Sequence, residues 1–381
     1  MHIAFLTPEY PHSRVLHSAG IGTSIKNLAV ALTQKGVKVS VFVYGQNEAL
    51  DFEEEGVKLH LIKTQKYKIL GCYLHRKYIQ NHLNTLIISE HIDLVEAPDW
   101  TGITAFMNLK VPLVIRFHGS DAYFCHLENR KQKLKNYWFE KLAFQKAKAF
   151  IAPTTFAGQL SQKIFNIKNK TIQTIHNGLD LHFFQNSNPE NFEKKVILYI
   201  GTIIRKKGVL ELAAIFNLVR QKHPGASLVL IGSDSFDIAT QSKSTWELMQ
   251  KEFKDNDFEK VSYLGKIPYQ AVLEHLKKAH VCVYPTFAET LGMVTIESMA
   301  MQKPVVNSNI GWAKEIIVDG ESGYLVHPKD HQLFANRINS VFENTDLMIQ
   351  IGNQARERVE AKFDIEKIAI ENITFFKSLI V

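Results

Sequence analysis

The sequence contains few cysteines and no long apolar run. Its three cysteines, Cys72, Cys125 and Cys282, lie far apart, and no Cys-x-x-Cys pair occurs. This excludes a disulfide framework and a zinc site of the usual spacing, and it favours a reducing compartment. No apolar stretch approaches the roughly 18 residues that a membrane-spanning helix requires. The chain enters its first predicted strand without a signal peptide, so we expect a cytoplasmic protein.

Metal-binding patterns, low-complexity segments and short repeats are also missing. The sixteen histidines are scattered, and no Asp-x-Asp pair follows a predicted strand, so we expect no metal site. The length of 381 residues exceeds what one ordinary core accommodates, which indicates two domains.

The net charge of +7 is unevenly distributed. Residues 1–185 carry 22 Lys and Arg against 14 Asp and Glu, a balance of +8, while the remainder carries 23 against 24. Lys63–Lys68, Arg76-Lys77 and Arg130–Lys135 supply much of the excess. A basic face of this kind binds nucleic acid, anionic lipid or an anionic acceptor, or is simply solvated. No aromatic-basic motif or known nucleic-acid module occurs, so we expect no nucleic-acid partner.

Strand and helix patterns alternate along the whole chain, which predicts parallel sheets with helices on both faces. One helix is predicted to open at Gly20 and to end at Gly36, and a basic helix at about 130–148. The polar stretch Phe183–Glu190 has no periodicity and contains Pro189, which indicates a hinge. The predicted strands are residues 2–7, 37–43, 57–62, 93–97, 112–117, 150–153 and 171–175 before the hinge, and 195–200, 227–231, 261–264, 281–284 and 304–307 after it.

Two glutamates bracket the most informative stretch, Glu289-Thr-Leu-Gly-Met-Val-Thr-Ile-Glu297. A predicted strand precedes it and an apolar helical stripe follows Gly292, so Glu289 lies in a strand-to-helix turn and Glu297 inside the helix. Backbone N–H groups and the positive end of the helix dipole at such a turn attract phosphate. The structural alternative is that Glu289 caps the helix and Glu297 is a solvated surface charge.

The segment FAETLGMVTIESMAMQKPVV, residues 287–306, resembles the Glu-x7-Glu segment of retaining glycosyltransferases with the GT-B fold, specifically glycosyltransferase family 4. The resemblance implies an α/β protein with two Rossmann-like, doubly wound parallel-sheet domains facing across a cleft. It also implies that Glu289 contacts the donor sugar, that Glu297 holds the ribose, and that the intervening turn contacts the donor. That turn comprises Thr290, Leu291, Gly292 and Met293.

The stretch Ile200-Gly-Thr-Ile-Ile-Arg-Lys-Lys-Gly208 looks like the strand-Gly-Arg…Lys-Gly motif of the same family. Lys207 and Gly208 match the family positions, but Thr202 stands where the family often has arginine. We assign Arg205 as its substitute, so that Arg205 and Lys207 would neutralise a diphosphate leaving group. Taken alone, this segment is equally a solvated basic loop.

Further site residues follow from the resemblance. Gly20 and Gly22 match the first glycine loop of the family, and we expect the Gly22 N–H to make the closer donor contact; a plain tight turn is the alternative. His118, in Phe-His-Gly, matches the histidine near the reaction centre, unless it is a structural side chain. The other expected donor contacts, at strand ends, are Gly201, Thr202, Ile231, Gly232, Leu264 and Gly265. Tyr10 and Asp121 are expected acceptor contacts.

The domains implied are residues 1–185 on the acceptor side and 186–364 for the nucleotide sugar, with a helix at about 365–381 packing back on the first. The expected activity is retaining, metal-independent transfer from a nucleotide-diphosphate sugar, with no cofactor, to a saccharide or lipid-linked acceptor in surface polysaccharide, lipopolysaccharide or glycolipid synthesis. We expect peripheral contact of the basic first domain with an anionic inner membrane face. The rivals are a GT-B epimerase or phosphorylase and a basic nucleic-acid-binding protein. A dehydrogenase is disfavoured because Gly20-Ile-Gly22 lacks a third glycine.

Overall fold

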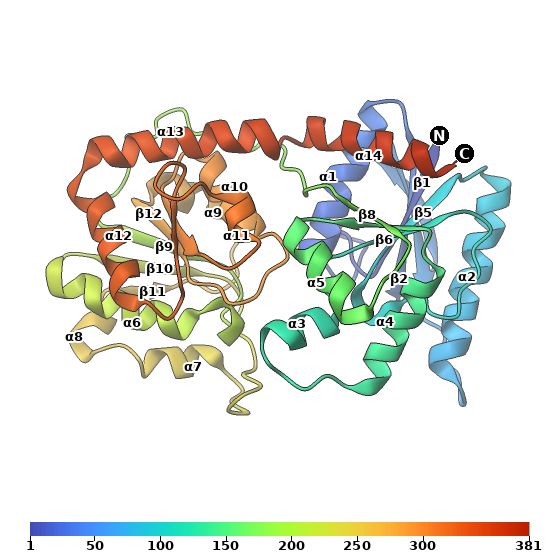
Figure 1. Cartoon of the computed structure of the whole chain (residues 1–381), viewed down its shortest axis with the longest axis horizontal. Helices are drawn as coiled ribbons and strands as arrows, with labels where there is room; N and C mark the ends of the chain where they lie inside the picture. The colour runs from blue at the N-terminus through green and yellow to red at the C-terminus, as the bar shows by residue number, and fades with distance from the viewer. Residues whose placement is uncertain (381) are drawn as a thin grey trace. The chain divides into compact units, whose positions relative to one another are not determined.

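The computed structural model describes residues 1–380, and for Asp255 it describes the backbone alone. The chain forms two compact units, each with its own sheet (Figure 1). Unit 1 comprises Met1–Asp180 together with the segment from Asp364 onward, and unit 2 comprises Leu181–Phe363. Val381, the last residue of the helix predicted at about 365–381, lies outside the described residues.

The sheet of unit 1 has eight strands in the order β3-β4-β2-β1-β5-β6-β7-β8. Their bounds are β1 His2–Thr7, β2 Lys38–Gln46, β3 Leu50–Glu54, β4 Val57–Lys63, β5 Leu94–Pro98, β6 Leu113–Arg116, β7 Ala149–Ala152 and β8 Thr171–Thr174. The central strand β1 is buried throughout and pairs in parallel with β2 and β5. Among the described strands of this sheet, β3 alone is antiparallel, against β4.

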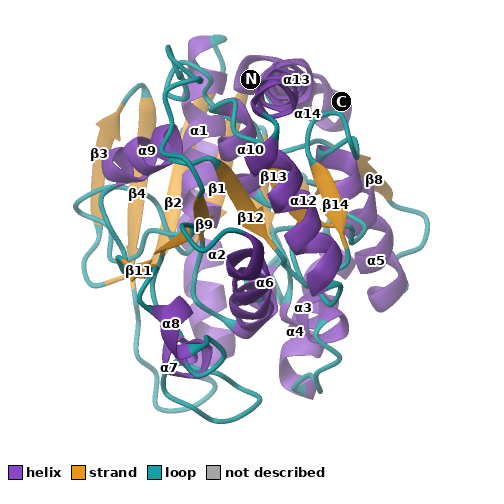
Figure 2. Ribbon diagram, turned by 90° about the vertical axis from the view of Figure 1, so that its left-hand side faces the viewer, coloured by secondary structure: helices purple, strands orange, loops and turns teal. Residues whose placement is uncertain are grey.

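Helices cover both faces of this sheet, as expected for a doubly wound unit (Figure 2). They are α1 Gly20–Gln34, α2 Gly71–Ser89, α3 Asp121–Leu127, α4 Leu134–Lys146, α5 Thr155–Phe165 and α14 Ile365–Ile380, with the 3-10 turn η1 Trp100–Gly102. On one face α1 and α14 pack through Leu28 and Phe376, and on the other α2 and α4 pack through Leu83 and Phe144. The strands therefore read as continuous apolar runs because both of their faces are buried.

The last helix belongs to unit 1 although it follows unit 2 in the chain. It packs against α1, and the buried Arg116 guanidinium at the end of β6 donates to Asn372 Oδ1 at 2.6 Å and to both Glu96 oxygens at 2.7 and 2.9 Å. Each of these three side chains is almost fully buried. A buried charge of this kind requires all of its partners, so this network joins α14 to the sheet.

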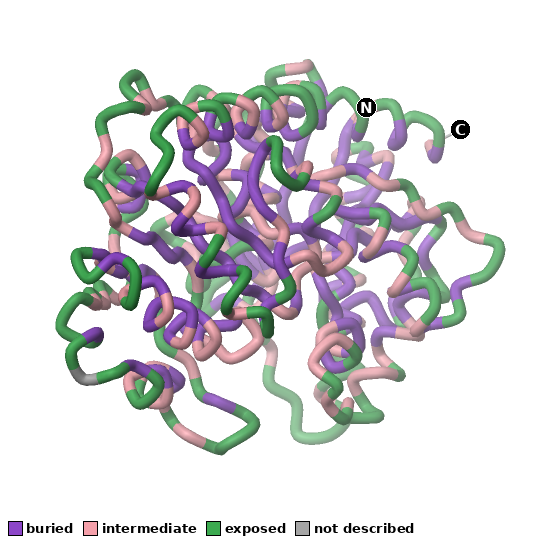
Figure 3. Tube along the Cα trace, turned by 60° about the vertical axis from the view of Figure 1, so that its left-hand side comes forward, coloured by how far each residue is buried: buried purple, intermediate pink, exposed green. Residues whose placement is uncertain are grey.

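The sheet of unit 2 has six parallel strands in the order β11-β10-β9-β12-β13-β14. The strands are β9 Val196–Ile200, β10 Ser227–Ile231, β11 Val261–Tyr263, β12 Val281–Tyr284, β13 Val305–Ser308 and β14 Tyr324–Val326. The helices are α6 Val209–Lys222, α7 Thr245–Gln250, α8 Asp255–Phe258, α9 Tyr269–Lys278, α10 Met293–Ala300, α11 Ala313–Ile316, α12 His331–Glu343 and α13 Thr345–Lys362, with the 3-10 turn η2 Arg205–Lys207. Buried residues are concentrated along the central strands of both sheets (Figure 3).

The predicted alternation of strands and helices is confirmed, with three differences. The sequence pattern predicted strands 2–7, 227–231 and 281–284 with their observed bounds. It missed the edge strands β3 and β14, and the basic helix expected at about 130–148 is α4, whose bounds are narrower. The expected parallel sheets are confirmed, except that the edge strand β3 of unit 1 runs antiparallel to β4.

Candidate active site

The strand order of unit 2 reverses direction between β9 and β12. From β9 the sheet grows through β10 to β11, and from β12 it grows the other way through β13 to β14. The loops that follow β9 and β12 therefore diverge at their carboxyl ends, which is where open parallel sheets place their ligands. The motif Gly201–Gly208 lies in the loop after β9, and the motif Glu289–Glu297 begins in the loop after β12 and continues into α10.

Glycines allow the strand ends of unit 2 to approach one another closely. Gly201 and Gly232 have φ of 153° and 145°, and a Cβ on Gly232 would lie 2.0 Å from the Gly201 oxygen. The Gly201 N–H donates to Ile231 O at 2.8 Å, and the Gly232 N–H donates to Gly265 O at 2.9 Å. The residues predicted at the ends of β9, β10 and β11 are thus brought together along one edge. Along this edge Leu264 is exposed and Ile231 is buried.

Lys207 and Glu289 form an ion pair that joins the loop after β9 to the loop after β12. The same loops are joined by a hydrogen bond from the Phe287 N–H to Lys206 O at 2.8 Å. Burial, with a contribution from the charge of Lys206, lowers the pKa of Lys207 to about 7. The carboxylate of Glu289 beside it stabilises the charged form. The structure therefore places a partly desolvated cation and an anion, both predicted site residues, next to each other.

Arg205, which the sequence suggested as the second diphosphate-binding cation, is held elsewhere. Its Nε and one terminal nitrogen donate to the two Asp237 oxygens at 2.8 and 2.9 Å. Asp237 is 1% exposed and also accepts from the Thr240 N–H and hydroxyl, and these contacts lower its pKa to about 2. A bidentate pair of this kind fixes the guanidinium, so Arg205 is less available to a ligand than we expected.

Glu297 lies inside α10, and Tyr269 at the start of α9 contacts it. Burial raises the pKa of Glu297 to about 7, and the hydrogen bond with Tyr269 opposes that rise. Tyr269 is 47% exposed. The sequence motifs did not identify Tyr269, because it lies far before Glu297 in the chain and no motif includes it.

The helix α10 is held in place by its polar side chains. It begins at Met293, directly after Gly292, whose φ of 92° is in the left-handed region, and it has no side-chain cap. The Tyr284 and Ser298 hydroxyls lie 2.7 Å apart, and Asn307 donates to Thr295 at 3.0 Å, which joins the helix to β12 and β13. Backbone N–H groups at a helix start without a side-chain cap attract anions, so the donor contacts expected at the turn Thr290–Met293 stay a prediction.

His118 in unit 1 lies on a turn that a buried carboxylate organises. Asp99 accepts from the backbone N–H of His118 at 2.9 Å and of Gly119 at 3.3 Å, and Gly119 has φ of 106°. Burial raises the pKa of Asp99 to about 7, and burial together with the charge of Arg116 lowers the pKa of His118 to about 3. The imidazole is therefore neutral at pH 7. Asp99 was not identified from the sequence.

Asp121 begins α3 and lies beside a second buried carboxylate, Glu140. Glu140 accepts from the backbone N–H of Asp121 at 2.8 Å and of Ala122 at 3.3 Å. Burial raises the pKa of Glu140 to about 8. The side chain of Asp121 accepts from Asn136 at 3.0 Å and is partly buried. Asp121 is thus committed to the packing of α3 on α4 and keeps limited exposure.

Two expected contacts near the amino terminus of unit 1, at Gly22 and Tyr10, do not fit the structure. The Gly22 N–H was expected to contact the donor, but it donates to Glu9 Oε1 at 2.9 Å, and a Cβ on Gly22 would lie 2.8 Å from the Glu9 carbonyl. Tyr10 was expected to contact an acceptor, but it is 0% exposed in the core of unit 1. By contrast, no atom lies within 4 Å of the point that a Cβ on Gly20 would occupy, so the start of α1 is open.

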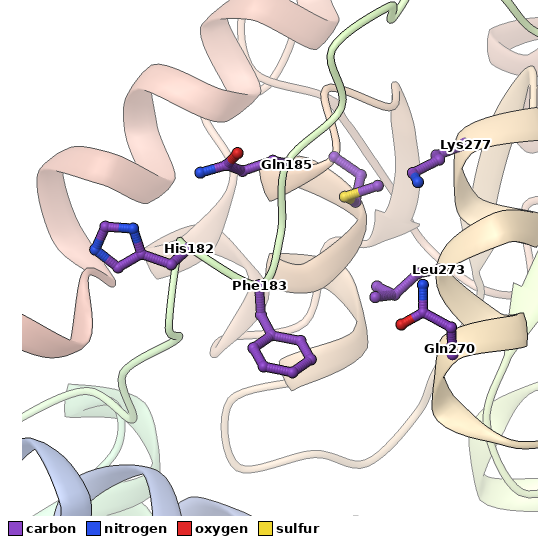
Figure 4. Close-up of a pocket in the computed structure, with 7 residues that line it drawn as sticks. His182, Phe183, Gln185, Gln270, Leu273 and Lys277 are labelled. Atoms are coloured by element: carbon purple, nitrogen blue, oxygen red, sulfur yellow. The ribbon is translucent and has the colours of Figure 1, made fainter.

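A separate pocket of about 250 Å³ lies in unit 2, at the segment where the chain passes from β8 towards β9 (Figure 4). It is lined by His182, Phe183, Gln185, Gln270, Leu273, Lys277 and Met301. No predicted site residue lines it. Within residues 1–380 no helix is both long and apolar enough to span a membrane, and no cluster of three or more His, Cys, Asp or Glu side chains has an arrangement suited to a metal ion.

Comparisons with known proteins agree with this geometry. The two-sheet architecture is the GT-B fold: the sucrose-phosphate synthase of Thermosynechococcus elongatus superposes with a TM-score of 0.80 at 20% identity, over 99% of this chain and 98% of that one. Anabaena HepE, solved in complex with UDP-glucose, gives 0.75 at 20% identity over 100% of both chains. The capsular polysaccharide biosynthesis glycosyltransferase CapM of Staphylococcus aureus is 28% identical over 207 residues, 50% of each chain.

The family models cover most of the chain. The model described as Glycosyltransferase Family 4 matches residues 18–183, and the model described as Glycosyl transferases group 1 matches residues 182–358. The chain therefore belongs to glycosyltransferase family 4, a family of nucleotide-sugar-dependent glycosyltransferases with the GT-B fold.

Proposed function

We propose that this glycosyltransferase is retaining and metal-independent, and that it moves a sugar from a nucleotide-diphosphate sugar to a saccharide or lipid-linked acceptor. The observation that carries the proposal is the Lys207–Glu289 ion pair at the point where the strand order of unit 2 reverses. Glu297 follows Glu289 by eight positions and is the fifth residue of α10, so one carboxylate precedes the start of this helix and the other follows it.

In this proposal unit 2 binds the donor through charges of both signs. Lys207 and the uncapped start of α10 neutralise the departing diphosphate, which a preorganised cation and helix dipole stabilise without a metal ion. Glu289 accepts hydrogen bonds from the sugar, and Glu297 accepts them from the ribose hydroxyls. Positioning and charge stabilisation, rather than a protein base, then lower the barrier.

His118 is assigned to the sugar and not to proton transfer. Its lowered pKa keeps the imidazole neutral at pH 7, so it donates or accepts one hydrogen bond without carrying charge. Asp99 orients it by holding the backbone of its turn. We assign Asp99 as a positioning residue that acts through His118.

The comparisons suggest a first donor and a first pathway to test. HepE was solved in complex with UDP-glucose, so UDP-sugars are the first donors to try. The name of CapM refers to capsular polysaccharide, which supports the proposal of a cell-surface polysaccharide or glycolipid product.

The proposal is tested by turnover. The purified protein is incubated with UDP-glucose and other UDP-sugars together with saccharide and polyprenyl-diphosphate-sugar acceptors, in the presence of a chelator, and release of the nucleoside diphosphate is measured. We expect release with one donor and an anomeric proton coupling in the product that matches the donor configuration. An inverted product, or release that depends on added divalent metal, contradicts the proposal.

A further inference from the structure

Large apolar side chains are exposed at one end of unit 1. Ile69 and Leu70, in the loop that leads into α2, are 75% and 69% exposed, and Leu134, at the start of α4, is 76% exposed. Monomeric proteins seldom gather such side chains on one surface without a partner for them. The complete set, here called the α2–α4 patch, is Tyr67, Ile69, Leu70, Tyr73, Leu74, Leu134 and Trp138.

The two parts of the patch adjoin each other. The Lys135 ammonium on α4 lies 3.6 Å from the Cys72 sulfur on α2, and the Arg76 guanidinium lies 4.4 Å from the centroid of the Phe139 ring. Phe106 bridges them, with ring centroids 5.5 Å from Tyr73 and 5.8 Å from Phe139. The first turns of α2 and α4 therefore present one continuous surface, at the lower side of unit 1 in Figure 1.

The backbone presents the apolar tip in a defined conformation. Leu70 caps α2 with φ of 55°, and its carbonyl accepts from the N–H groups of Tyr73 and Leu74 at 2.9 and 3.0 Å. A left-handed leucine is unfavourable unless its surroundings fix it. The loop is thus held with Ile69 and Leu70 turned to solvent, instead of folding them onto the protein.

The segments that carry the patch contain positive charge only. No acidic residue occurs between Lys63 and Gln80 or between Asn129 and Phe139. The exposed lysines of these two segments are Lys63, Lys66, Lys68, Lys131, Lys133 and Lys135. The surface therefore combines aliphatic tips, aromatic rings with polar ends and a set of lysines.

We propose that the α2–α4 patch docks on an anionic lipid bilayer. Aliphatic side chains enter the boundary between headgroups and acyl chains, tyrosine and tryptophan favour the headgroup level, and lysines are attracted to anionic lipids. A nucleic-acid surface would instead need aromatic rings free to stack on bases, and the most exposed side chains, Ile69, Leu70 and Leu134, cannot stack. The exposed aliphatic side chains, together with the lysines, thus favour an anionic bilayer over a nucleic acid.

The patch lies at the same edge of the sheet as His118, which relates the docking to the acceptor. In a parallel α/β unit, the helix after a strand starts at the carboxyl edge of the sheet, as α2 does after β4 and α3 does after β6. The first turn of α4 lies beside the start of α3, because Asn136 donates to Asp121 at 3.0 Å. His118 lies at that same edge, directly after β6. We therefore infer that the acceptor is lipid-linked and reaches the enzyme from the bilayer to which the patch binds. This inference rests on the proposed function.

The test is flotation of the full chain with vesicles of phosphatidylcholine alone or mixed with phosphatidylglycerol. We expect binding to the anionic vesicles at low salt and release at high salt. The double variants Ile69→Ser with Leu70→Ser and Lys66→Gln with Lys68→Gln should each weaken binding about tenfold or more. The matched controls, Ile88→Ser at the other end of α2 and Lys38→Gln with Lys110→Gln at the amino edge of the sheet, should leave it unchanged.

Three results overturn the docking proposal: wild type that does not float with anionic vesicles, controls that lose as much binding as the patch variants, or stronger binding to an oligonucleotide than to vesicles. The rise in Tm that UDP causes is measured on every variant, and we expect the same rise as in wild type. Wild type that UDP stabilises but that does not float with anionic vesicles rejects the docking alone. Vesicle binding without stabilisation by any nucleotide rejects the proposed function and leaves the docking standing.

Discussion

At the scale of single residues, the ion pair between Lys207 and Glu289 is the most consequential feature of unit 2. Neither side chain is more than 20% exposed, so each stabilises the other where water contributes little. In the proposed site Lys207 meets the charge that develops on the diphosphate only as the sugar departs. Its effect should therefore appear in kcat rather than in donor affinity alone.

We predict that Lys207→Gln lowers kcat by about 10²–10³-fold, the usual cost of removing one preorganised electrostatic partner. The measurement is steady-state turnover with the donor identified for the wild type. Lys254→Gln, an exposed lysine in the turn before α8, is the control for charge removal. A Lys207→Gln variant whose kcat stays within about twofold of wild type is incompatible with this role.

Glu297 predicts a pH dependence with a definite sign. Burial raises its pKa from 4.5 to about 7, so the native state binds a proton that the unfolded chain has released between these values. The contribution of Glu297 to the free energy of unfolding therefore falls as the pH rises from about 4.5 to 7. Nucleotide binding has the opposite trend, because it needs the carboxylate and so strengthens as the pH rises to 7. Below pH 7 the Kd of the nucleotide should increase about tenfold per pH unit.

Calorimetric titration of the nucleotide on either side of pH 7 checks this prediction. Glu297→Gln cannot ionise, so its affinity should be low and should not show this acid limb. If the acid limb persists in Glu297→Gln, another group controls it and the assignment of Glu297 to the ribose loses its support.

The residues that the sequence motifs identified and those that they missed differ in how far along the chain their partners lie. Glu289 and Lys207 lie in short segments that follow a strand, and Glu297 lies in the helix after Glu289, so a local motif can identify all three. Asp237 pairs with Arg205 from 32 positions away, and Asp99 holds His118 from 19 positions away. Such partners depend on which strands become neighbours, which no local pattern reports.

At the scale of elements, close backbone approach determines how the loops after β9 and β12 fit together. Gly208 has φ of 69°, and a Cβ there would lie 1.8 Å from the Pro285 oxygen. An alanine must therefore displace the start of α6 from the end of β12. Gly225 provides the comparison, because nothing lies within 4 Å of its Cβ position.

We predict that Gly208→Ala lowers the unfolding free energy by roughly 2–4 kcal/mol, since it combines backbone strain with a steric clash. Gly225→Ala should change it by less than about 1 kcal/mol. Urea unfolding of both variants beside the wild type gives the comparison. Equal stabilities for the two variants would mean that the Gly208–Pro285 contact relaxes at little cost.

The C-terminal helix α14 is joined to the sheet of unit 1 by a buried polar contact. We predict that Asn372→Ala destabilises the protein by about 1–3 kcal/mol, because the Arg116 donor loses its buried partner. Glu371→Ala, one position earlier and exposed, is the control. The measurement is again urea unfolding, and a loss in Asn372→Ala no greater than in the control would show that water replaces the amide.

The elements also indicate what a sequence pattern can predict. Strands such as β1 and β12 are buried on both faces and appear as unbroken apolar runs, so their bounds were predicted correctly. The strand β3, Leu50-Asp-Phe-Glu-Glu, is a half-exposed edge with three acids, and β14 has only three residues. Both form because a neighbouring strand offers hydrogen bonds, which is tertiary information.

At the scale of the whole molecule, the two units differ in net charge. Unit 1 carries 24 Lys and Arg against 17 Asp and Glu, and unit 2 carries 21 of each, so the entire net charge of +7 belongs to unit 1. Unit 2 carries no net charge, so the donor site that we propose there depends on local groups, Lys207 and the start of α10, and not on a general positive field. The excess on unit 1 remains for a large anionic surface, as the α2–α4 patch suggests.

The central claim is that unit 2 binds a nucleoside diphosphate with Glu297 on its ribose, and thermal unfolding with UDP, GDP, ADP and CMP tests it most directly. One of them, at 100 times its Kd, should stabilise wild type by about 2.7 kcal/mol, a rise in Tm of roughly 5–10 °C for a unit of this size. The same nucleotide should leave Glu297→Ala unshifted at that concentration. If no nucleotide raises the Tm of wild type, or if the variant shifts as far as wild type does, the account of this site is contradicted.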